Sequence, residues 1–251
     1  MSIRYILEKL SRGIILKRRM PNDLGGRAIF VSPEGGLRYW KPRLKSIDPM
    51  LSQVVQQFIN KGDIIWDIGT NLGFFSLASI SKSKTGSCLS IEPDIWLCNI
   101  LERTKRLNND LNIDILPIAV SDEIGISKFI IANRARSTNH LYDVKGSTQT
   151  GGVRQIKYVP TFTLDYLLEL YSPPDFLKID TEGAEWLVLK GALKVLAHKP
   201  KILIEVFQDS FTEVKNILTN SDYKLYNADF LPTLIEIDSS PCENILALYN
   251  T

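Results

Sequence analysis

The chain has 251 residues, of which 44% are hydrophobic and 23% are charged, and its formal net charge is +2. This composition is ordinary for a globular protein with a sizeable core, and so small a net charge argues neither for nor against nucleic acid as a partner. No segment reaches the roughly 18 apolar residues that a membrane-spanning helix needs, which excludes that class.

The three cysteines, Cys88, Cys98 and Cys242, are scattered along the chain. They form no CxxC pair and no Cys/His cluster of the kind that binds zinc. The first 20 residues carry charges throughout and have no uninterrupted apolar core, so we expect no secretory signal. These features predict a cytoplasmic protein.

Residues 1–40 form a basic arm, with eight Lys or Arg against three Asp or Glu. Within residues 2–16, apolar residues recur at helical spacing and predict a helix with a basic polar side; they are Ile3, Ile6, Leu7, Leu10 and Ile14. Such a helix can make weak contact with a membrane surface, or it can pack on the body or on another subunit of a homo-oligomer. The segment has no Trp or Phe anchor, which favours packing.

Two further elements are predicted before the main run of strands. Residues 27–40 predict a β-hairpin, because Ser-Pro-Glu-Gly-Gly is turn chemistry between two β-rich runs. Residues 47–60 predict a helix, with Ser46 or Asp48 as its cap and Pro49 in its first turn.

Beyond residue 60, short apolar runs alternate with helix-like stretches. Seven runs predict strands: 63–68, 87–92, 113–120, 175–180, 201–206, 223–226 and 245–249. The helix-like stretches are 74–82, 94–109, 163–171 and 183–197. This alternation predicts a doubly wound, mostly parallel, seven-stranded α/β sheet whose last strand is antiparallel. We therefore divide the chain into an N-terminal extension of helix, hairpin and helix (1–60) and a main domain (61–251).

Residues 64–77 read IIWDIGTNLGFFSL, an apolar strand followed by a sharp turn and the start of a helix. The turn has Gly69 and Gly73 but no glycine at 71, so it departs from the GxGxxG of dinucleotide-binding turns. No Lys follows the second glycine, which excludes a P-loop. The spacing therefore does not predict a phosphate site.

The same turn suits a ligand that carries both an ammonium and a carboxylate. Asp67 ends the strand beside the crevice where open α/β sheets bind ligands, so it can accept from the ammonium, directly or through water. Gly69 permits a close backbone approach or a positive φ, and Gly73 permits tight packing of helix on strand. Loop N–H groups can bind the carboxylate. The methionine end of S-adenosylmethionine (SAM) is such a ligand, and we assign Thr70 and Asn71 to the same contact.

Two more strand ends carry matching signals. Glu92, followed by Pro93 in SIEPD, ends the second strand, where an acid can accept both ribose hydroxyls. Ala119, Val120 and Asp122 end the third strand, where the adenine would lie. Three such signals at consecutive strand ends predict a SAM cavity more strongly than any one of them alone.

With these motifs the chain resembles the FkbM-type SAM-dependent methyltransferases. The resemblance covers about residues 60–207 and rests on WDIGTNLGFFSL, SIEPD, LPIAVSDEIG, FTLDYLLE, FLKIDTEGAEWLVLKGA and ILIEV. Residues 176–192 are its most specific part. It implies a Rossmann-like fold, SAM as the methyl donor and usually a hydroxyl acceptor. Thr70 replaces a common alanine and Trp66 a common Val or Ile, and neither change affects the expected SAM binding.

Asp180 ends the fourth strand, beside the expected position of the methyl group, and Glu182 follows it. A hydroxyl acceptor benefits from a base that removes its proton, and the candidates are Asp180, Glu182, Glu205 and His140. Glu185 is better suited to a structural cap at a helix start. The three candidate acids are of a type that binds divalent ions, but their spacing does not require one and we predict no metal.

Motifs that are absent from the sequence narrow the class of methyl acceptor. The end of strand four reads Asp-Thr-Glu-Gly instead of the [DNS]-P-P-[YFW] of many base amino-methylases, and no Pro-Cys loop is present. Acids near the acceptor would repel a phosphate backbone, so we expect no nucleic-acid partner. A neutral hydroxylated acceptor, such as a sugar in a glycan or a small natural product, fits better. The long polar loop 133–152 and the basic arm match the family least, and we expect them to select the acceptor.

Two alternatives belong to other functional classes. A NAD-dependent oxidoreductase needs the missing glycine at 71, and no Tyr-x-x-x-Lys site supports it. A non-catalytic SAM-fold module would bind a partner or membrane through the basic arm. The intact cofactor turn argues against a module that has lost SAM binding.

Overall fold

The computed structural model describes residues 3–42, 44, 47–146, 148–237 and 240–249. Ser46, the alternative cap of the predicted helix at 47–60, lies outside the described residues. Among those described, no helix has the length and apolar character needed to cross a membrane.

The main sheet has seven strands in the described part of the chain, ordered β12-β13-β11-β10-β3-β4-β5. Its strands are β3 (Ile65–Ile68), β4 (Cys88–Ile91), β5 (Ile113–Leu116), β10 (Phe176–Ile179), β11 (Lys201–Glu205), β12 (Tyr223–Asn227) and β13 (Asn244–Tyr249). β13 is antiparallel to both β11 and β12, and the remaining neighbours pair in parallel. The predicted, mostly parallel sheet with an antiparallel last strand is confirmed.

Helices cover both faces of this sheet. On one face lie α2 (Pro49–Phe58), α3 (Phe74–Ser83) and α4 (Ile95–Leu107). On the other lie α5 (Leu164–Leu167), α6 (Glu185–Lys190), α7 (Leu193–Ala197) and α8 (Phe211–Asn220). β3 shows the alternation that separates the faces: Ile65 packs in the first cluster, Trp66 and Ile68 in the second. The doubly wound arrangement is therefore confirmed.

Local sequence explains where several of these helices begin and end. Asp48 caps α2 by accepting from the N–H of Leu51 at 3.0 Å, and Pro49 takes the first position, as predicted. The helix predicted at 183–197 is instead two helices, because the chain turns at Gly191. A Cβ there would lie 2.4 Å from the carbonyl oxygen of Ser121, so only glycine allows this contact. The sequence did not predict α8.

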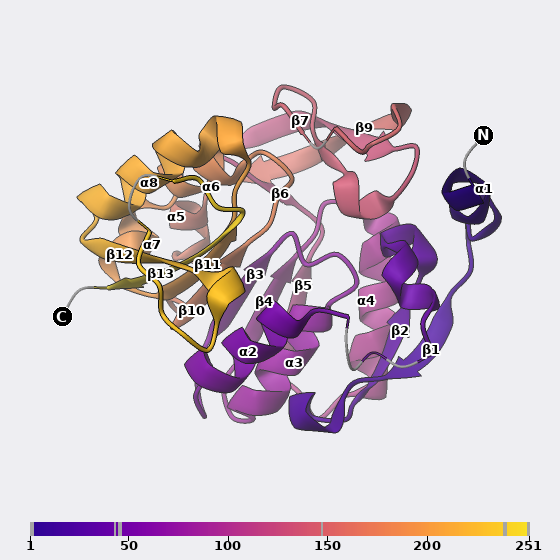
Figure 1. Ribbon diagram of the computed structural model, residues 1–251, viewed down its shortest axis with the longest axis horizontal. Coiled ribbons are helices and arrows are strands. Elements are labelled where there is room, and N and C mark those ends of the chain that lie inside the picture. Colours follow the sequence, from indigo (N-terminus) through magenta and orange to yellow (C-terminus); the bar gives the residue numbers. More distant parts are fainter. Residues whose placement is uncertain (1–2, 43, 45–46, 147, 238–239, 250–251) are drawn as a thin grey trace.

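A second sheet was missed by the sequence. In the described residues it has four strands in the order β6-β9-β7-β8: β6 (Ala119–Val120), β7 (Gly125–Ala132), β8 (His140–Leu141) and β9 (Val153–Phe162). The strand predicted at 113–120 is split at Pro117, which has no N–H to continue the ladder. β7 and β9 lie at the top of Figure 1, above β3, β4 and β5 in that view.

The N-terminal hairpin differs from the prediction. β2 (Ala28–Val31) pairs antiparallel with β1 (Leu16–Arg19), which precedes it, so a hairpin over 27–40 is wrong. Ser32 accepts from the N–H of Glu34 at 3.2 Å and starts a 3₁₀ turn, η2 (Pro33–Gly35), followed by a second, η3 (Leu37–Trp40). The helix α1 is also shorter than predicted, spanning Ile3–Leu10.

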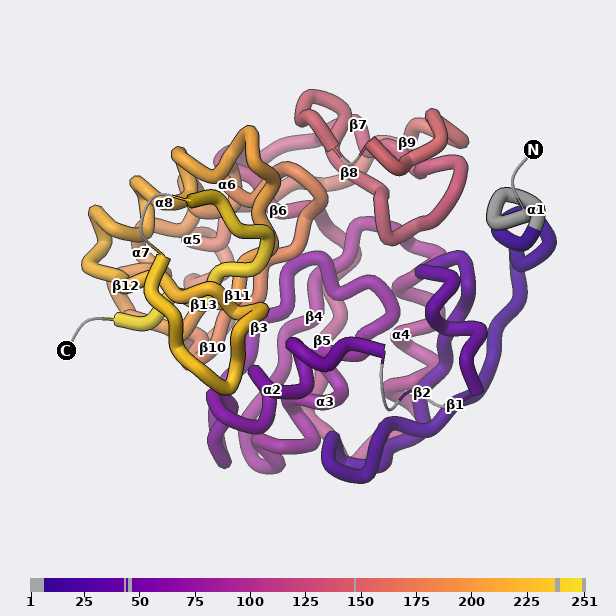
Figure 2. Tube along the Cα trace, in the orientation of Figure 1, coloured from indigo at the N-terminus to yellow at the C-terminus, as the bar shows by residue number. Residues whose placement is uncertain are grey.

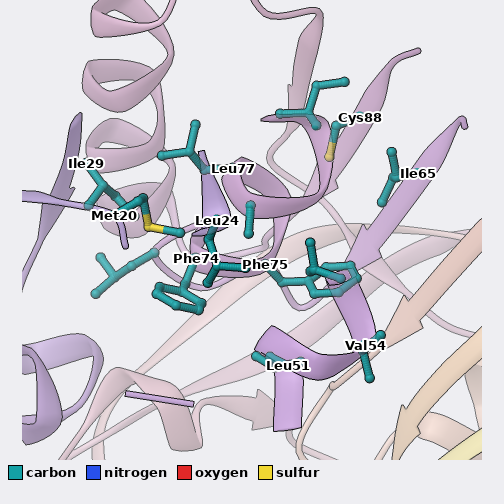
Figure 3. Packing of buried hydrophobic residues seen from close by; sticks show 14 of the residues in the cluster. Met20, Leu24, Ile29, Leu51, Val54, Ile65, Phe74, Phe75, Leu77 and Cys88 are labelled. Atoms are coloured by element: carbon teal, nitrogen blue, oxygen red, sulfur yellow. The ribbon is translucent and has the colours of Figure 1, made fainter. Parts of the chain in front are cut away.

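The N-terminal segment shares its core with the main domain. Figure 2 shows this segment running along the right of the molecule, beside α4, and β2 contacts that helix. One apolar cluster joins the two parts, and Figure 3 labels ten of its members: Met20, Leu24, Ile29, Leu51, Val54, Ile65, Phe74, Phe75, Leu77 and Cys88. We propose that residues 1–60 are an extension that folds together with the main domain.

Ile29→Ala tests this shared core. Ile29 is fully buried, so its truncation is expected to lower the free energy of unfolding by about 2–5 kcal/mol. Ile126→Ala, at a side chain that is 75% exposed, serves as the control and should change it by less than about 0.5 kcal/mol. Urea denaturation followed by circular dichroism measures both. A second unfolding transition for the extension, with the main transition unchanged in Ile29→Ala, would contradict the proposal.

Candidate functional site

A cavity of about 270 Å³ lies at the carboxyl ends of β3, β4 and β10. Nine of the predicted site residues line it: Gly69, Asn71, Glu92, Pro93, Ala119, Val120, Asp180, Glu182 and Glu205. Five others do not appear in its lining: Asp67, Thr70, Gly73, Asp122 and His140. The structure thus brings the predicted strand ends together around one space, which we call the cofactor cavity.

The turn after β3 depends on two glycines. Gly69 has φ +77°, and a Cβ there would lie 1.7 Å from the carbonyl oxygen of Asp180. Gly73 has φ +80°, and a Cβ would lie 2.5 Å from the Leu101 side chain. Any other residue would clash in this backbone conformation. The turn is therefore pressed against the end of β10, which places the cofactor turn beside the predicted catalytic acids.

The backbone N–H groups of this turn are already used within the chain. Those of Gly69 and Thr70 donate to the carbonyl of Ile91 at 2.9 and 3.0 Å, that of Gly73 to Thr70 at 3.0 Å, and that of Asn71 to Glu92 at 2.9 Å. These four donors therefore hold the turn in place, three of them against the end of β4 and one within the turn. The contact between loop N–H groups at the helix start and the ligand carboxylate stays a prediction.

Asp67 lies behind the turn and is fully buried. Ser76 donates to its Oδ2 at 2.6 Å, and the Lys178 ammonium lies 3.4 Å from its Oδ1. The Thr70 hydroxyl donates to the Asp67 carbonyl oxygen at 2.7 Å. Asp67 and Thr70 thus fix the end of β3. Asp67 is buried outside the cavity lining, and its contact with the ligand ammonium, direct or through water, stays a prediction.

Glu92 is held in place by its own neighbours. Its two carboxyl oxygens accept from the N–H groups of Asn71 and Asp94, each at 2.9 Å, and the side chain is 5% exposed. Burial raises its pKa to about 8, against the opposing effect of these two hydrogen bonds. Each oxygen keeps a further lone pair, so a carboxyl fixed in this way can accept ribose hydroxyls, as the sequence predicted.

One end of the cofactor cavity is an apolar slot. It is lined by Ile118, Ala119, Val120, Phe129 and Leu141. The last two come from β7 and β8 of the second sheet, which the sequence did not predict. Asp122, predicted to contact the adenine, instead lines a separate cavity and accepts from the Ser121 hydroxyl at 3.0 Å.

A buried ion network forms one wall of this cavity. Arg136 pairs with Asp94 and with Glu34 (3.1 Å), and it lies 4.5 Å over the Trp96 ring. Glu34 also pairs with Arg154 at 2.6 Å. The N-terminal extension and the polar loop are thereby tied together beside β4. None of these residues was predicted from the sequence to belong to the site.

Asp180, Glu182 and Glu205 gather at the other end of the cavity. Asp180 accepts from the Lys178 ammonium at 3.2 Å. Glu182 has φ +57°, and its turn is held by Glu185, which accepts from the N–H groups of Thr181 (2.9 Å) and Gly183 (3.0 Å). Glu185 is buried, in agreement with the structural role expected for it. Among the described residues, no group of three or more His, Cys, Asp or Glu is arranged to hold a metal ion.

The environment of these acids raises two of their pKa values. Burial raises the pKa of Glu182 to about 9, and the charges of Asp180 and Glu205 act in the same direction. For Glu205 the charge of Asp180 is the largest cause and burial the second, and together they raise the pKa to about 8. Both carboxyls therefore titrate well above the ordinary carboxyl range, on the alkaline side of neutral pH.

A second cavity of about 650 Å³ adjoins the first. It is lined by Thr138, Gln149, Glu182, Glu205, Val206, Phe207, Gln208, Pro241, Cys242 and Glu243. Glu182 and Glu205 are the described residues that line both cavities, so they stand between the two spaces. We call this the acceptor cavity. Its wall between Val206 and Gln208 was not predicted.

His140 takes no part in either lining. It is 8% exposed, its Nδ1 lies 3.0 Å from the carbonyl oxygen of Thr138, and a Cβ on Gly146 would lie 2.5 Å from the ring. The proposed role of His140 as a base therefore lacks support from its position. It packs in the polar loop as a structural residue.

The cofactor cavity fits SAM. Its apolar slot suits an adenine ring, and Glu92 lies between that slot and the turn after β3, where the ribose would be held. The acids Asp180 and Glu182 lie at the far end, beside Gly69. An apolar end, a fixed carboxyl in the middle and a charged end follow the chemistry of SAM from base to amino acid.

Comparisons with known proteins agree with this geometry. Residues 67–225 match the family described as the methyltransferase FkbM domain. A comparison with curated proteins found no match.

Solved structures with similar folds include three methyltransferases or their relatives. Precorrin-6y C5,15-methyltransferase from Geobacter metallireducens has 12% identity over 79% of this chain and 86% of its own, with a TM-score of 0.44. A SAM-dependent O-methyltransferase from Thermotoga maritima has 12% identity, 88% and 73% coverage, and a TM-score of 0.47. Aeropyrum pernix fibrillarin with natively bound SAM has 11% identity, 77% and 69% coverage, and a TM-score of 0.44.

The family match spans well over half of the chain and includes the turn after β3, Glu92 and the acids that follow β10 and β11. The chain belongs to the FkbM methyltransferase family, and it is a methyltransferase that uses SAM as its cofactor.

Proposed function

We propose that the protein methylates a hydroxyl group on a neutral, polyhydroxylated acceptor: a sugar in a glycan or a small natural product. The observation that carries this proposal is that Glu182 and Glu205 line both cavities. An acceptor in the second cavity would reach the carboxyl groups that also border the cofactor.

The lining of the acceptor cavity supports a sugar-like ligand. Thr138, Gln149 and Gln208 bring hydroxyl and amide groups, which donate and accept hydrogen bonds without net charge. Phe207 adds an aromatic surface. Neutral hydrogen-bonding groups beside an apolar ring are suited to a molecule with many hydroxyls and apolar C–H faces. The acids in the same wall disfavour a phosphate-rich acceptor such as nucleic acid.

The chemistry asked of the protein is modest. SAM supplies a methyl group already activated by its sulfonium, so the chain must align the hydroxyl and remove its proton. A base works best when its pKa lies near the working pH, and Glu182 and Glu205 meet this condition. Asp180 is paired with the Lys178 ammonium, so its carboxylate is better suited to compensating that positive charge than to acting as the base.

Membership of a methyltransferase family sets aside the NAD-dependent oxidoreductase. A non-catalytic SAM-binding module remains the competing function. The arrangement of two adjoining cavities with shared carboxyls favours catalysis, because a module that only binds SAM needs no second cavity beside the methyl end.

The acceptor class is tested directly with methyl-labelled SAM. The full chain is incubated with neutral hexoses and deoxyhexoses, the matching amino-hexoses and a single-stranded oligonucleotide. We expect methyl ethers of the neutral sugars, identified by mass spectrometry after hydrolysis. Methylation of the amino-hexose nitrogen or of the oligonucleotide, with the neutral sugars unmodified, would contradict the proposed acceptor.

Glu205→Gln removes a candidate base and keeps the side chain's size. We expect kcat to fall about 10²–10⁴-fold with unchanged affinity for SAM, because proton removal is lost while cofactor contacts stay. Glu243→Gln is the matched control, because Glu243 lines the acceptor cavity and does not line the cofactor cavity. This variant should change the KM for the acceptor and leave kcat near the wild-type value. Equal kcat values in both variants would rule out a base role for Glu205.

The raised pKa values predict a rate that depends on pH. A base acts when unprotonated, so kcat should rise from about pH 6 and level off once the pH passes the raised pKa of Glu205, about 8. Over the same range the free energy of unfolding should fall, because the folded state keeps protons that the unfolded chain, with ordinary carboxyl pKa values, has released. Steady-state kinetics and urea denaturation measure the two trends. A flat kcat profile would contradict the assignment.

A further inference from the structure

The amino-acid end of SAM carries a carboxylate, and most N–H groups of the turn after β3 are already engaged within the chain. Four of the N–H groups between Gly69 and Gly73 already donate within the chain. Asp180 adds negative charge at this end of the cavity, and the carboxyl groups of Glu182 and Glu205 lie beside it. A carboxylate bound here therefore needs a cation to offset both its own charge and its desolvation.

Among the described residues that line the cofactor cavity, the cationic ones are Arg38 and Arg136. Arg136 is committed to the structure: its side chain is 10% exposed and it pairs with both Glu34 and Asp94. It also covers the Trp96 ring. Because its guanidinium already pairs with two carboxylates, Arg136 has a structural role in the wall of the cavity.

Arg38 is placed differently. It comes from η3 in the N-terminal extension, where the next residue, Tyr39, is 2% exposed and anchors the segment. The Arg38 side chain is 45% exposed, donates to Asp48 Oδ2 at 3.3 Å, and places its guanidinium 5.6 Å from the centre of the Tyr39 ring. Because a guanidinium has five N–H donors in a planar fork, these contacts leave donors for a ligand.

Arg38 also lies at the correct end of the cavity. It borders a small adjoining cavity of about 70 Å³ together with Asp180, Glu205 and Lys178, at the ends of β10 and β11. The apolar slot for the adenine is lined by other segments, including Phe129 and Leu141. Arg38 and the turn after β3 therefore border the same cavity.

We propose that Arg38 binds the α-carboxylate of SAM. A guanidinium pairs with a carboxylate through two parallel N–H donors, which adds direction as well as charge. The N-terminal extension thereby completes the cofactor site, and a residue outside the part of the chain that matches the family recognises the amino-acid end of the ligand.

The test pairs a change in the protein with a change in the ligand. Titration calorimetry compares the full-length wild type and Arg38→Gln, each with SAM and with decarboxylated SAM, which lacks the carboxylate. We expect Arg38→Gln to weaken SAM binding on the order of 10- to 100-fold and to leave decarboxylated SAM almost unaffected. Arg38→Lys, which keeps the charge, should recover part of the loss.

The control is Arg106→Gln, an equal charge change at an exposed position of α4 outside the cavity lining. It should bind both ligands like the wild type. Unchanged SAM affinity in Arg38→Gln would overturn the proposal, and so would an equal loss for both ligands, which marks a structural role. No acceptor is present in these titrations, so the result is independent of the proposed hydroxyl chemistry.

Discussion

The site depends on one buried ammonium, that of Lys178, which lies between two carboxylates. This ammonium is 3.2 Å from Asp180 Oδ2 and 3.4 Å from Asp67 Oδ1. Lys178 and Asp67 are also register partners on the neighbouring strands β10 and β3. Removing one partner of a buried ion pair typically costs about 3–5 kcal/mol, because a charge is left without compensation. This contact and the close approach of Gly69 to Asp180 hold two strand ends together, so that the cofactor turn and the acids open into one cavity.

The charges around Lys178 show which segments of the chain supply the acids and which supply the cations of the cofactor cavity. Lys178 compensates Asp67 and Asp180, while Glu182 and Glu205 lie further out, where their neighbours raise their pKa values. The ends of the main-sheet strands thus supply the acids of the cofactor cavity. The cations of the cofactor cavity come from elsewhere: the N-terminal extension and the polar loop. Of these two cations, Arg38 lies outside the residues that match the family and Arg136 lies within them.

The sequence predicted the elements whose signals are local. The buried run at Ile65–Ile68, the two glycines of the turn and the acids at the strand ends could be placed because spacing along the chain determines them. The second sheet and the ion network could not, because they depend on distant partners: Arg136 meets Glu34 across 102 positions and Arg154 meets it across 120. The prediction of a hairpin at 27–40 was wrong because Ser-Pro-Glu-Gly-Gly can also start a 3₁₀ turn, as it does here. Which structure forms depends on the partner of β2, and that partner is the earlier strand β1.

The central claim is that one cavity holds the cofactor, the adjoining one holds the acceptor, and Glu182 and Glu205 stand between them. A crystal structure of the full chain with S-adenosylhomocysteine tests it most directly. We expect the product to occupy the cavity lined by Gly69, Glu92 and Val120 and to leave the cavity beside Phe207 open. Product bound beside Phe207, with the Glu92 cavity empty, would contradict it.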